Sequence, residues 1–518
     1  FMLVSCAPTL TDPIKLESGN ISGTASSDGA VKVYKGIPYA AAPVGDLRWR
    51  PPQPVEPWED VNRCEQFGPR CPQIPFTEDS FWNTREWVDN TEQSEDCLFL
   101  NLWTAGKTPG DKLPVMVWIH GGGLTSGSAS QPLYDGTKMA REGVVVVTIN
   151  YRVGPFGFLA HPELSRESEY GSSGNYGLLD QVAALRWVQQ NIAKFGGDPR
   201  RVTIFGESAG SRSVCSLMAT PLAKGLFQRA IGQSGGGFGA MSRLKEDRPG
   251  SPAAEKTGLV LSRIVGGAES PATLETLRSL SANELLEAVQ KTPNVRPQII
   301  IDGWVFPDEI HTVFEQGKQS PVDVIVGFNA DEGTSMFGGM RSMSVEQFRA
   351  MVQRQYGEFA EEFFEIYPVN SEDEVQDAFL ASIRDGWFAW QMRTWAELMS
   401  TVDKEAFLYY FTRVPPIPDS EKYGAYHSAE HAYIVGNLDI ASFTPEPADQ
   451  QLSEAMMGYW VNFAKTGDPN GESLVEWPAF KTDSEYYLNL GDELRVGQHL
   501  LKEEFDFFSR YNTSKRVH

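Results

Sequence analysis

The chain has 518 residues, and its 45 Lys and Arg against 68 Asp and Glu give a formal net charge of −23. This length can bury a large core, and the negative charge argues against nucleic acid or an anionic membrane surface as a partner. No apolar run approaches the roughly 18 residues that a transmembrane segment requires.

The first residues resemble an export signal only in part. Leu3-Val-Ser-Cys6 is similar to the lipobox at which bacterial lipoprotein signals are cut and the cysteine is acylated. Only five residues precede Cys6, and none of them is basic. We therefore expect residues 1–13 to be a disordered or signal-derived N-terminus, with a lipid anchor at Cys6 as the alternative.

The next part of the chain predicts a hairpin, two buried strands and one long helix. Residues 14–39 alternate around Ser27-Asp-Gly29, which is typical of an antiparallel hairpin. The nearly unbroken apolar runs at 113–119 and 144–149 are typical of strands covered on both faces by helices. Between residues 176 and 195, apolar side chains recur at helical spacing.

A nucleophile elbow is predicted after this helix. A short apolar run ends in Gly206-Glu-Ser-Ala-Gly210 and leads into helix-forming sequence, as in the strand–turn–helix that presents the serine of G-x-S-x-G. A second match is centred on Ser234, but the glycine-rich residues 235–239 that follow it cannot form a helix. We therefore predict Ser208 as the nucleophile and the backbone N–H of Ala209 as an oxyanion donor.

The rest of the chain alternates predicted strands with predicted helices, which is typical of an α/β sheet. The strands are expected at 229–232, 322–327 and 407–411, and the helical stretches at 272–290 and 452–465. The helix-rich residues 335–405 are expected to form insertions over the carboxyl ends of the strands, where ligands bind in such sheets. Because no linker or repeat divides the chain, we expect residues 14–518 to form a single catalytic domain.

A serine nucleophile needs a base, and the base needs an acid that orients it. In α/β hydrolases these groups follow in the order serine, acid, histidine. Five histidines precede the acid turn or lie in the polar tail, namely His120, His161, His311, His499 and His518. His427 and His431 remain as candidate bases, and either Asp331 or Glu332 in the turn after the 322–327 strand could orient an imidazole.

An oxyanion hole needs N–H groups that converge on one point, and glycines allow that approach. His120-Gly121-Gly122-Gly123 stands at the end of the 113–119 strand, in the position of the HGGG motif of esterases and lipases. We therefore combine Gly122 and Gly123 with Ala209 as the predicted donors.

These motifs together resemble the type-B carboxylesterases, the family that also contains the cholinesterases and bacterial esterases. The matching segments are Tyr34–Ala40, Leu47–Trp49, Ser94–Leu102, His120–Gly123, Asn150–Arg152, Gly174–Gln181, Gly206–Gly210, Gly327–Gly333 and Thr466–Asn470. The resemblance implies an α/β-hydrolase fold, with a central, mostly parallel sheet covered by helices, an N-terminal antiparallel hairpin and helical insertions over the active site.

The resemblance also implies which of the remaining candidates act. The family uses the Glu of the Asp-Glu-Gly turn, hence Glu332, and the histidine three residues before a Glu, hence His427 before Glu430. Ser428 stands where the family often has Gly. The family pairs the cysteines that match Cys71 and Cys97, which implies an oxidising compartment and an exported protein, periplasmic or secreted, with a cytoplasmic location as the alternative.

The expected activity is that of a carboxylic-ester hydrolase acting through an acyl-enzyme on neutral, small-to-medium esters. No metal or organic cofactor is predicted, because no His, Cys and Asp residues cluster at metal-ligand spacing. One alternative is an esterase specialised for choline, feruloyl, phthalate or lipid esters. The other is a non-catalytic adhesion protein of the same fold, against which the intact predicted triad argues.

The expected substrate pocket is roomy on its acyl side. Cholinesterases that select acetyl groups carry bulky aromatics before the Asp-Gly that matches Asp302-Gly303, whereas residues 291–301 contain no aromatic residue. Val295 and Phe238 are expected to line this side. Trp82 or Trp87, in the loop between the paired cysteines, is a candidate cation-binding face, with ordinary loop packing as the alternative.

Overall fold

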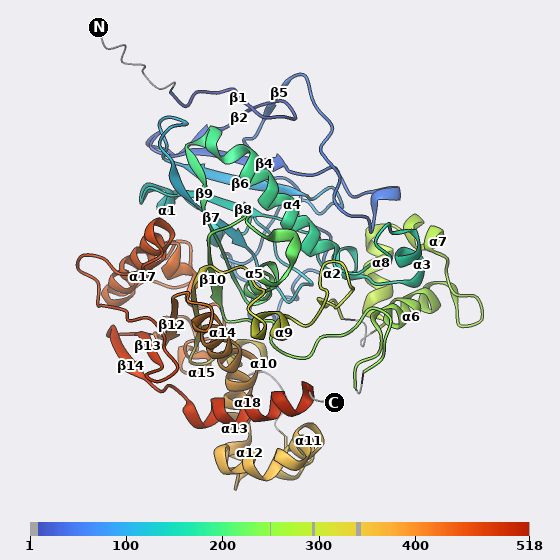
Figure 1. Ribbon diagram of the computed structural model, residues 1–518, viewed down its shortest axis with the longest axis vertical. Coiled ribbons are helices and arrows are strands. Elements are labelled where there is room, and N and C mark those ends of the chain that lie inside the picture. Colours follow the sequence, from blue (N-terminus) through green and yellow to red (C-terminus); the bar gives the residue numbers. More distant parts are fainter. Residues whose placement is uncertain (1–8, 249, 293–295, 338–342, 517–518) are drawn as a thin grey trace. The chain divides into compact units, whose positions relative to one another are not determined.

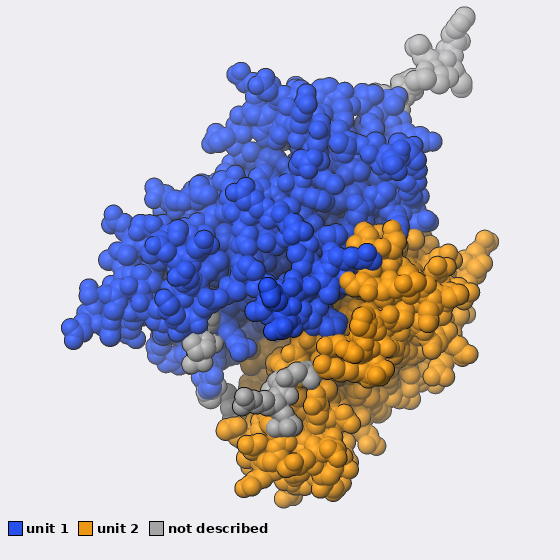
Figure 2. Space-filling view, turned by 180° about the vertical axis from the view of Figure 1, so that it is seen from behind, with its two compact units in different colours: residues 1–229, 241–313 blue, residues 230–240, 314–518 orange. Residues whose placement is uncertain are grey.

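The structure is a computed structural model that describes residues 9–248, 250–292, 296–337 and 343–516. The chain divides into two compact units, shown in different colours in Figure 2. Unit 1 comprises residues 1–229 and 241–313, and unit 2 comprises residues 230–240 and 314–518. Val295, the predicted pocket residue, and Cys6, the predicted lipidation site, lie outside the described residues.

The main sheet of unit 1 has the strand order β9-β7-β8-β6-β4-β3 (Figure 1). Its strands are β3 (Thr24–Ala25), β4 (Lys32–Pro38), β6 (Phe99–Thr104), β7 (Leu113–Ile119), β8 (Val145–Ile149) and β9 (Gly197–Glu207). β9, β7 and β8 are parallel, whereas β6 and β4 are antiparallel to their neighbours. β7 and β8 confirm the predicted strands, and all of β8 is buried, as expected for a strand covered on both faces.

The predicted hairpin over residues 14–39 divides between two sheets. β3 and β4 form an antiparallel pair around the Ser27-Asp-Gly29 turn, with Thr24 opposite Val33. The residues before them belong to a small separate sheet of β1 (Ile14–Lys15), β2 (Asn20–Ser22) and β5 (Val61–Arg63). The alternating pattern could not reveal this division, because it states which face of a strand is buried but not which partner it pairs with.

The helices of unit 1 include the long helix predicted before the nucleophile turn. They are α1 (Thr137–Arg141), α2 (Gly154–Phe158), α3 (Pro162–Glu167), α4 (Tyr176–Asn191), α5 (Ala209–Ala219), α6 (Ala254–Gly266), α7 (Leu274–Ser279), α8 (Ala282–Gln290) and α9 (Ile310–Glu315), whose end lies in unit 2. Short 3-10 turns are η1 (Gly45–Leu47), η2 (Pro132–Tyr134), η3 (Ile192–Phe195) and η4 (Pro221–Ala223). η3 extends α4 through the predicted helical region of 176–195, and Gly196 ends it at a φ of 83°.

The helical stretch predicted at 272–290 is two helices, α7 and α8. Ser281 begins α8 with a capping box, in which its hydroxyl accepts the Glu284 N–H and the Glu284 side chain accepts the Ser281 N–H. The Ser-x-x-Glu spacing is a known helix-start signal, so the sequence contained the evidence for this break.

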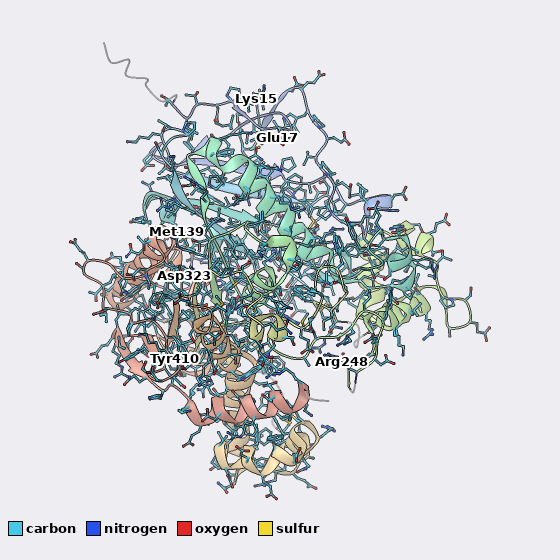
Figure 3. The ribbon with its side chains drawn as sticks, viewed as in Figure 1. Lys15, Glu17, Met139, Arg248, Asp323 and Tyr410 are labelled. Atoms are coloured by element: carbon cyan, nitrogen blue, oxygen red, sulfur yellow. A yellow bond between two sulfur atoms is a disulfide. The ribbon has the colours of Figure 1, made fainter. Side chains whose placement is uncertain are left out.

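Unit 2 has strands in the order β14-β13-β12-β11-β10. They are β10 (Arg229–Gln233), β11 (Asp323–Asn329), β12 (Ala406–Phe411), β13 (Tyr486–Leu490) and β14 (Arg495–Gln498). β11, β12 and β13 are parallel and β14 is antiparallel. Asp323 begins β11, and Tyr410 lies near the end of β12; both are labelled in Figure 3. In the β11–β12 pair, Tyr410 stands opposite Phe328. The predicted strands at 229–232, 322–327 and 407–411 are thereby confirmed.

The helices of unit 2 confirm that residues 335–405 are rich in helix. They are α10 (Thr334–Phe337), α11 (Val345–Tyr356), η5 (Gly357–Phe359), α12 (Ala360–Ile366), α13 (Glu372–Ile383), the π-helix η6 (Arg384–Ala389), α14 (Trp390–Ser400), α15 (Ser420–Tyr423), α16 (His431–Ile434), α17 (Pro447–Thr466) and α18 (Lys502–Arg516). The sequence predicts a polar tail after His499, but that tail forms α18. Phe505, Phe507 and Phe508 of α18 are buried, and Phe507 packs near Phe363 of α12.

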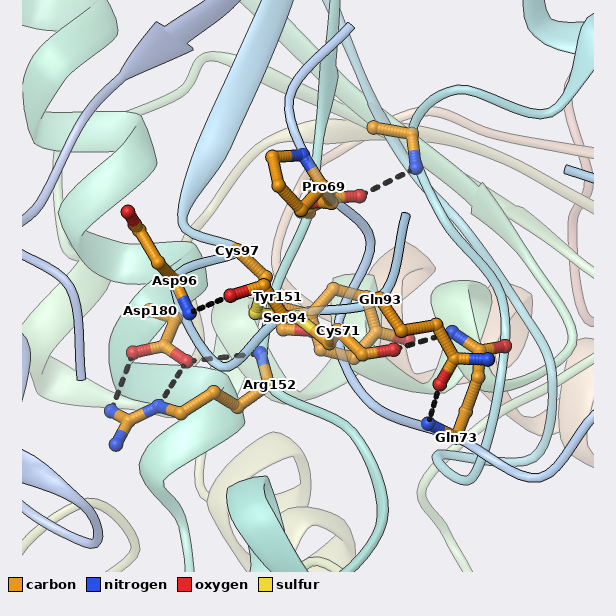
Figure 4. The surroundings of a disulfide bond; sticks show 12 residues. Pro69, Cys71, Gln73, Gln93, Ser94, Asp96, Cys97, Tyr151, Arg152 and Asp180 are labelled. Atoms are coloured by element: carbon orange, nitrogen blue, oxygen red, sulfur yellow. Dashed lines mark hydrogen bonds and ion pairs between the residues drawn. A yellow bond between two sulfur atoms is a disulfide. The ribbon is translucent and has the colours of Figure 1, made fainter. Parts of the chain in front are cut away.

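A disulfide joins Cys71 to Cys97 in unit 1, the pairing that the family resemblance implies (Figure 4). Cys71 Sγ lies 3.1 Å from the Tyr151 carbonyl oxygen, which places the bond directly beside the segment that follows β8. Cys64 and Cys215 are buried and do not take part in this disulfide. In the described part of the chain, no helix is both long and apolar enough to cross a membrane.

Candidate active site

Ser208 of unit 1 occupies a strained turn between β9 and α5. Its backbone has φ 55° and ψ −120°, a region that residues with a side chain rarely adopt. The strand ends at Glu207 and the helix begins at Ala209, so the strand–turn–helix context expected of a nucleophile elbow is present. The N-terminal end of the eleven-residue helix therefore adjoins Ser208 and favours negative charge there.

The glycines on either side of Ser208 are required by close packing against β7. A Cβ on Gly206 would lie 2.6 Å from the Ile119 carbonyl oxygen, and one on Gly210 would collide with the same oxygen. The turn therefore depends on two positions without side chains, which is the physical reason for the G-x-S-x-G spacing.

The glycine loop after β7 lies beside the nucleophile. A Cβ on Gly121 would lie 3.2 Å from the Ser208 Cβ, and Gly122 and Gly123 have positive φ values of 100° and 62°. Since β7 and β9 are parallel neighbours, their carboxyl ends bring the predicted donors Gly122, Gly123 and Ala209 to the same edge of the sheet.

His120 shapes this loop from within the core. Its Nδ1 lies 2.9 Å from the Gly121 carbonyl oxygen, and its ring stacks on Tyr151, whose hydroxyl donates to the His120 carbonyl oxygen. Burial lowers the pKa of His120 to about 4, so its imidazole is neutral at physiological pH. A buried neutral histidine of this kind supports the loop.

Glu332 and His427 of unit 2 form a buried pair. Glu332 Oε2 lies 2.5 Å from His427 Nδ1, and the other oxygen of Glu332 accepts the backbone N–H of Asn329. Asp331, the other acid candidate, instead accepts the Ala425 N–H through its carboxylate. The structure therefore distinguishes two neighbouring acids that sequence chemistry alone could not. Glu332 contacts the imidazole of His427, whereas Asp331 binds the backbone of the loop that carries His427.

His431, the second base candidate, lies at the start of α16 and is buried. Burial and the neighbouring His427 lower the pKa of His431 to about 3.

The ring of Phe388 packs 4.9 Å from the His427 ring, so an aromatic wall from the π-helix η6 borders the acid–histidine pair.

Glu430 is a buried acid that the sequence analysis used only as a marker for His427. Asn329 Nδ2 and Gln233 Nε2 donate to its two oxygens, at 2.6 Å and 3.1 Å. Burial, together with the negative charge of Glu332, raises the pKa of Glu430 to about 7. A second carboxyl group therefore adjoins the acid–histidine pair, and the His-x-x-Glu spacing is the sequence signal that could have suggested it.

The two described pocket candidates lie in different units. Phe238 of unit 2 is fully buried, with its ring edge-on to Phe314 at 5.2 Å and to Trp395 at 6.2 Å. Trp82 of unit 1 is half-buried, and its ring meets Trp87 edge-on at 5.2 Å. The rings of Phe238 and Trp82 therefore both pack against aromatic neighbours.

Ser234, the alternative nucleophile, has a different setting. It follows β10 with a φ of 53°, is fully buried, and donates its N–H to the Gly327 carbonyl oxygen. No helix follows it in the described residues before α6, and its hydroxyl has no hydrogen-bond partner within the described structure. The strand–turn–helix context that favours Ser208 over Ser234 in the sequence is therefore also present in the structure.

Within the described part of the chain, no group of three or more His, Cys, Asp or Glu residues could hold a metal ion. The described groups are, in unit 1, a serine hydroxyl beside a glycine loop and, in unit 2, an imidazole paired with a carboxylate. Such a set suits acyl transfer.

The sequence model of the carboxylesterase family matches residues 11–508. The chain is 36% identical over 510 residues to the fumonisin B1 esterase of Sphingopyxis macrogoltabida, covering 95% of this chain and 89% of that protein. It is 37% identical over 500 residues to the para-nitrobenzyl esterase of Bacillus subtilis, covering 93% and 95%. A thermophilic PNB esterase structure matches with a TM-score of 0.82 at 34% identity, covering 96% and 99% of the two chains.

Proposed function

The chain belongs to the carboxylesterase family and has its α/β-hydrolase fold, and we propose that it hydrolyses carboxylic esters through an acyl-enzyme. The observation that carries the proposal is the strained Ser208 turn at the start of α5, beside a glycine loop. The buried pair of Glu332 and His427 supplies the remaining groups that this chemistry needs.

In the proposed reaction, Ser208 attacks the ester carbonyl while His427 takes the serine proton. His427 then gives this proton to the departing alcohol, and Glu332 keeps the imidazole in the orientation that both transfers require. The backbone N–H groups of Gly122, Gly123 and Ala209 stabilise the oxyanion. Water then attacks the acyl-enzyme by the same sequence of proton transfers and releases the acid.

We propose neutral esters of small to medium size as substrates. The net charge of −23 disfavours anionic substrates by long-range repulsion. The similar proteins are named for different esters, so family membership leaves the natural ester open. Esters of choline, ferulate, phthalate or lipids are the specialised alternatives.

The acyl side of the site is proposed to be roomy. Residues 291–301 contain no aromatic side chain, but η6 places Phe388 on the His427 ring and leaves Trp387 49% exposed. We expect kcat/KM to rise from acetyl to butyryl esters, by up to about fourfold for each buried methylene. A p-nitrophenyl ester series that prefers acetate would show that η6 closes this space.

We further propose that the protein is exported. The Cys71–Cys97 disulfide supports an oxidising compartment, because such bonds rarely persist among cytosolic thiols. A lipid anchor at Cys6 remains part of this proposal as the alternative to free secretion. Mass spectrometry of the protein purified from its native host would detect an acylated or cleaved N-terminus.

The decisive test is covalent labelling with an organophosphate, followed by peptide mapping. The label should fall on Ser208, and Ser208→Ala should reduce kcat by about 10⁶-fold, as loss of a serine nucleophile does. Ser234→Ala is the matched control and should remain folded with residual turnover. Label on Ser234, or full activity in Ser208→Ala, would overturn the assignment.

A further inference from the structure

Unit 1 contains a cavity that the proposed reaction does not use. Its volume is about 720 Å³, within the range of sites that hold small molecules. Three stretches that are distant in sequence contribute most of its wall, at 46–53, 164–186 and 302–305. Neither Ser208 nor the glycine loop is among its lining residues.

A stacked aromatic pair forms one wall of this cavity. The rings of Tyr170 and Trp304 are parallel, with centroids 3.7 Å apart and an interplanar angle of 3°. Tyr170 is 54% exposed, so this large ring is held at the cavity without being buried by the fold. No Lys or Arg of the described residues lies over either ring, which leaves the electron-rich face of Tyr170 available to a ligand.

The aromatic pair is fixed in place by the backbone beneath it. Asp302 accepts the N–H groups of Trp304, Val305 and Phe306, and its second oxygen accepts the Ser172 hydroxyl at 2.5 Å. These bonds join the loop of Trp304 to the segment that follows Tyr170. A wall held in this way needs little ordering when a ligand binds.

The charges around the cavity favour a cation. Its lining has four carboxylates, Asp46, Glu167, Glu169 and Asp302, against the guanidinium groups of Arg50 and Arg186. Glu167 is paired with Arg278 and lies 3.6 Å from Arg50, so its charge is compensated. Asp46 and Glu169 have no basic side chain within ion-pair distance among the described residues.

We propose that this cavity is a non-catalytic binding site for a small organic cation with a flat, delocalised or quaternary nitrogen group. The ring of the ligand would stack on Tyr170, while Asp46 and Glu169 would lie near its positive charge. An anion would meet the excess of carboxylates, and a neutral ring would gain only the stacking contribution. The proposal does not depend on the esterase reaction.

The test is calorimetric titration of the full chain with N-methylquinolinium, a flat quaternary cation. Quinoline at a slightly alkaline pH is the matched probe, because it has the same ring system without the charge. We expect saturable binding of one N-methylquinolinium, at least about fivefold tighter than quinoline, and weaker binding as salt is raised.

Variants then assign the binding to this cavity. Tyr170→Ala should weaken binding by about tenfold, whereas Tyr170→Phe keeps the ring and should bind within about twofold of the unchanged chain. The double variant Asp46→Asn with Glu169→Gln should remove most of the preference for the cation over quinoline. Circular dichroism would show whether each variant is folded.

Three results would overturn the proposal. The first is equal binding of quinoline and N-methylquinolinium, and the second is unchanged binding by folded Tyr170→Ala. The third is the absence of saturable N-methylquinolinium binding, including the case in which only a neutral sugar such as methyl glucoside binds and the aromatic wall serves a different ligand class.

Discussion

The nucleophile turn of unit 1 and the acid–histidine pair of unit 2 are built in different ways. Around Ser208 the backbone decides the geometry, because Gly206 and Gly210 approach β7 too closely for any side chain. Around His427 the geometry comes from side chains, with Glu332 on its ring nitrogen and Glu430 buried close by. The first half therefore depends on steric fit, and the second depends on the balance of buried charges.

The two units also differ in covalent support. All five cysteines precede residue 216, so the Cys71–Cys97 disulfide belongs to unit 1, as do Cys64 and Cys215. Unit 2 relies on packing and ion pairs, such as the buried contact of Arg413 with Asp449. Changes that act on backbone, charge or disulfide should thus affect the two units separately.

The largest effect is expected from the side-chain half of the site. His427→Gln should lower kcat by about 10³-fold or more with the fold intact, because it removes the proposed general base. His431→Gln is the control four residues away, and steady-state kinetics should show a much milder loss. The reverse ranking would mean that the wrong histidine has been assigned.

Loss of the disulfide should destabilise unit 1 selectively. Replacing Cys71 and Cys97 by Ser releases a loop closed across 26 positions, which the chain-entropy model values at about 3 kcal/mol. Denaturant unfolding with hydrogen-exchange mass spectrometry would locate the effect. Reducing agent should destabilise the natural chain but not the double variant. Equal loss of hydrogen-exchange protection in both units would contradict the expectation that the disulfide stabilises unit 1 selectively.

A methyl group at the nucleophile turn should destabilise the fold by about 1–3 kcal/mol, as overpacking of a core does. Gly210→Ala is the change, since its Cβ would collide with the Ile119 carbonyl oxygen. Gly110→Ala is the matched control in unit 1, because its Cβ would meet only the Thr108 hydroxyl at 3.5 Å. Chemical denaturation of both variants measures the difference, and equal stabilities would refute the steric argument.

The smallest effect is a pH dependence that originates in unit 2. The raised pKa of Glu430, about 7, means that the folded state holds its proton more tightly than the unfolded chain does. Stability should therefore fall as pH rises from about 4.5 to 7, by on the order of 1 kcal/mol or more.

Glu430→Gln should flatten this slope, whatever its effect on absolute stability. Glu454→Gln is the control, because Glu454 is exposed on α17 and should leave the slope unchanged. Denaturant unfolding across this pH range provides the measurement. A slope that persists in Glu430→Gln would assign the titration to another group.

Local patterns in the sequence were sufficient for several strands, for the long helix before the nucleophile turn and for the turn itself. The strands β7 and β8 and the helix α4 follow from periodicity, because the spacing of apolar residues along each segment shows whether one face or both faces are buried. The Ser208 turn follows from a five-residue spacing, because its steric requirement lies within the same short segment. Glycine at positions 206 and 210 is therefore both the sequence signal that predicts the turn and the steric requirement for forming it.

Only the tertiary structure decided what depends on distant segments. The contact of Glu332 with His427 joins residues 95 positions apart. The residues of the turn alone left Asp331 and Glu332 equal, the family resemblance pointed to Glu332, and the structure shows what each carboxylate contacts. The stacking of Tyr170 on Trp304 likewise requires two loops to meet. Contacts between distant segments arise from the packing of whole elements, and no periodicity or spacing within one segment predicts them.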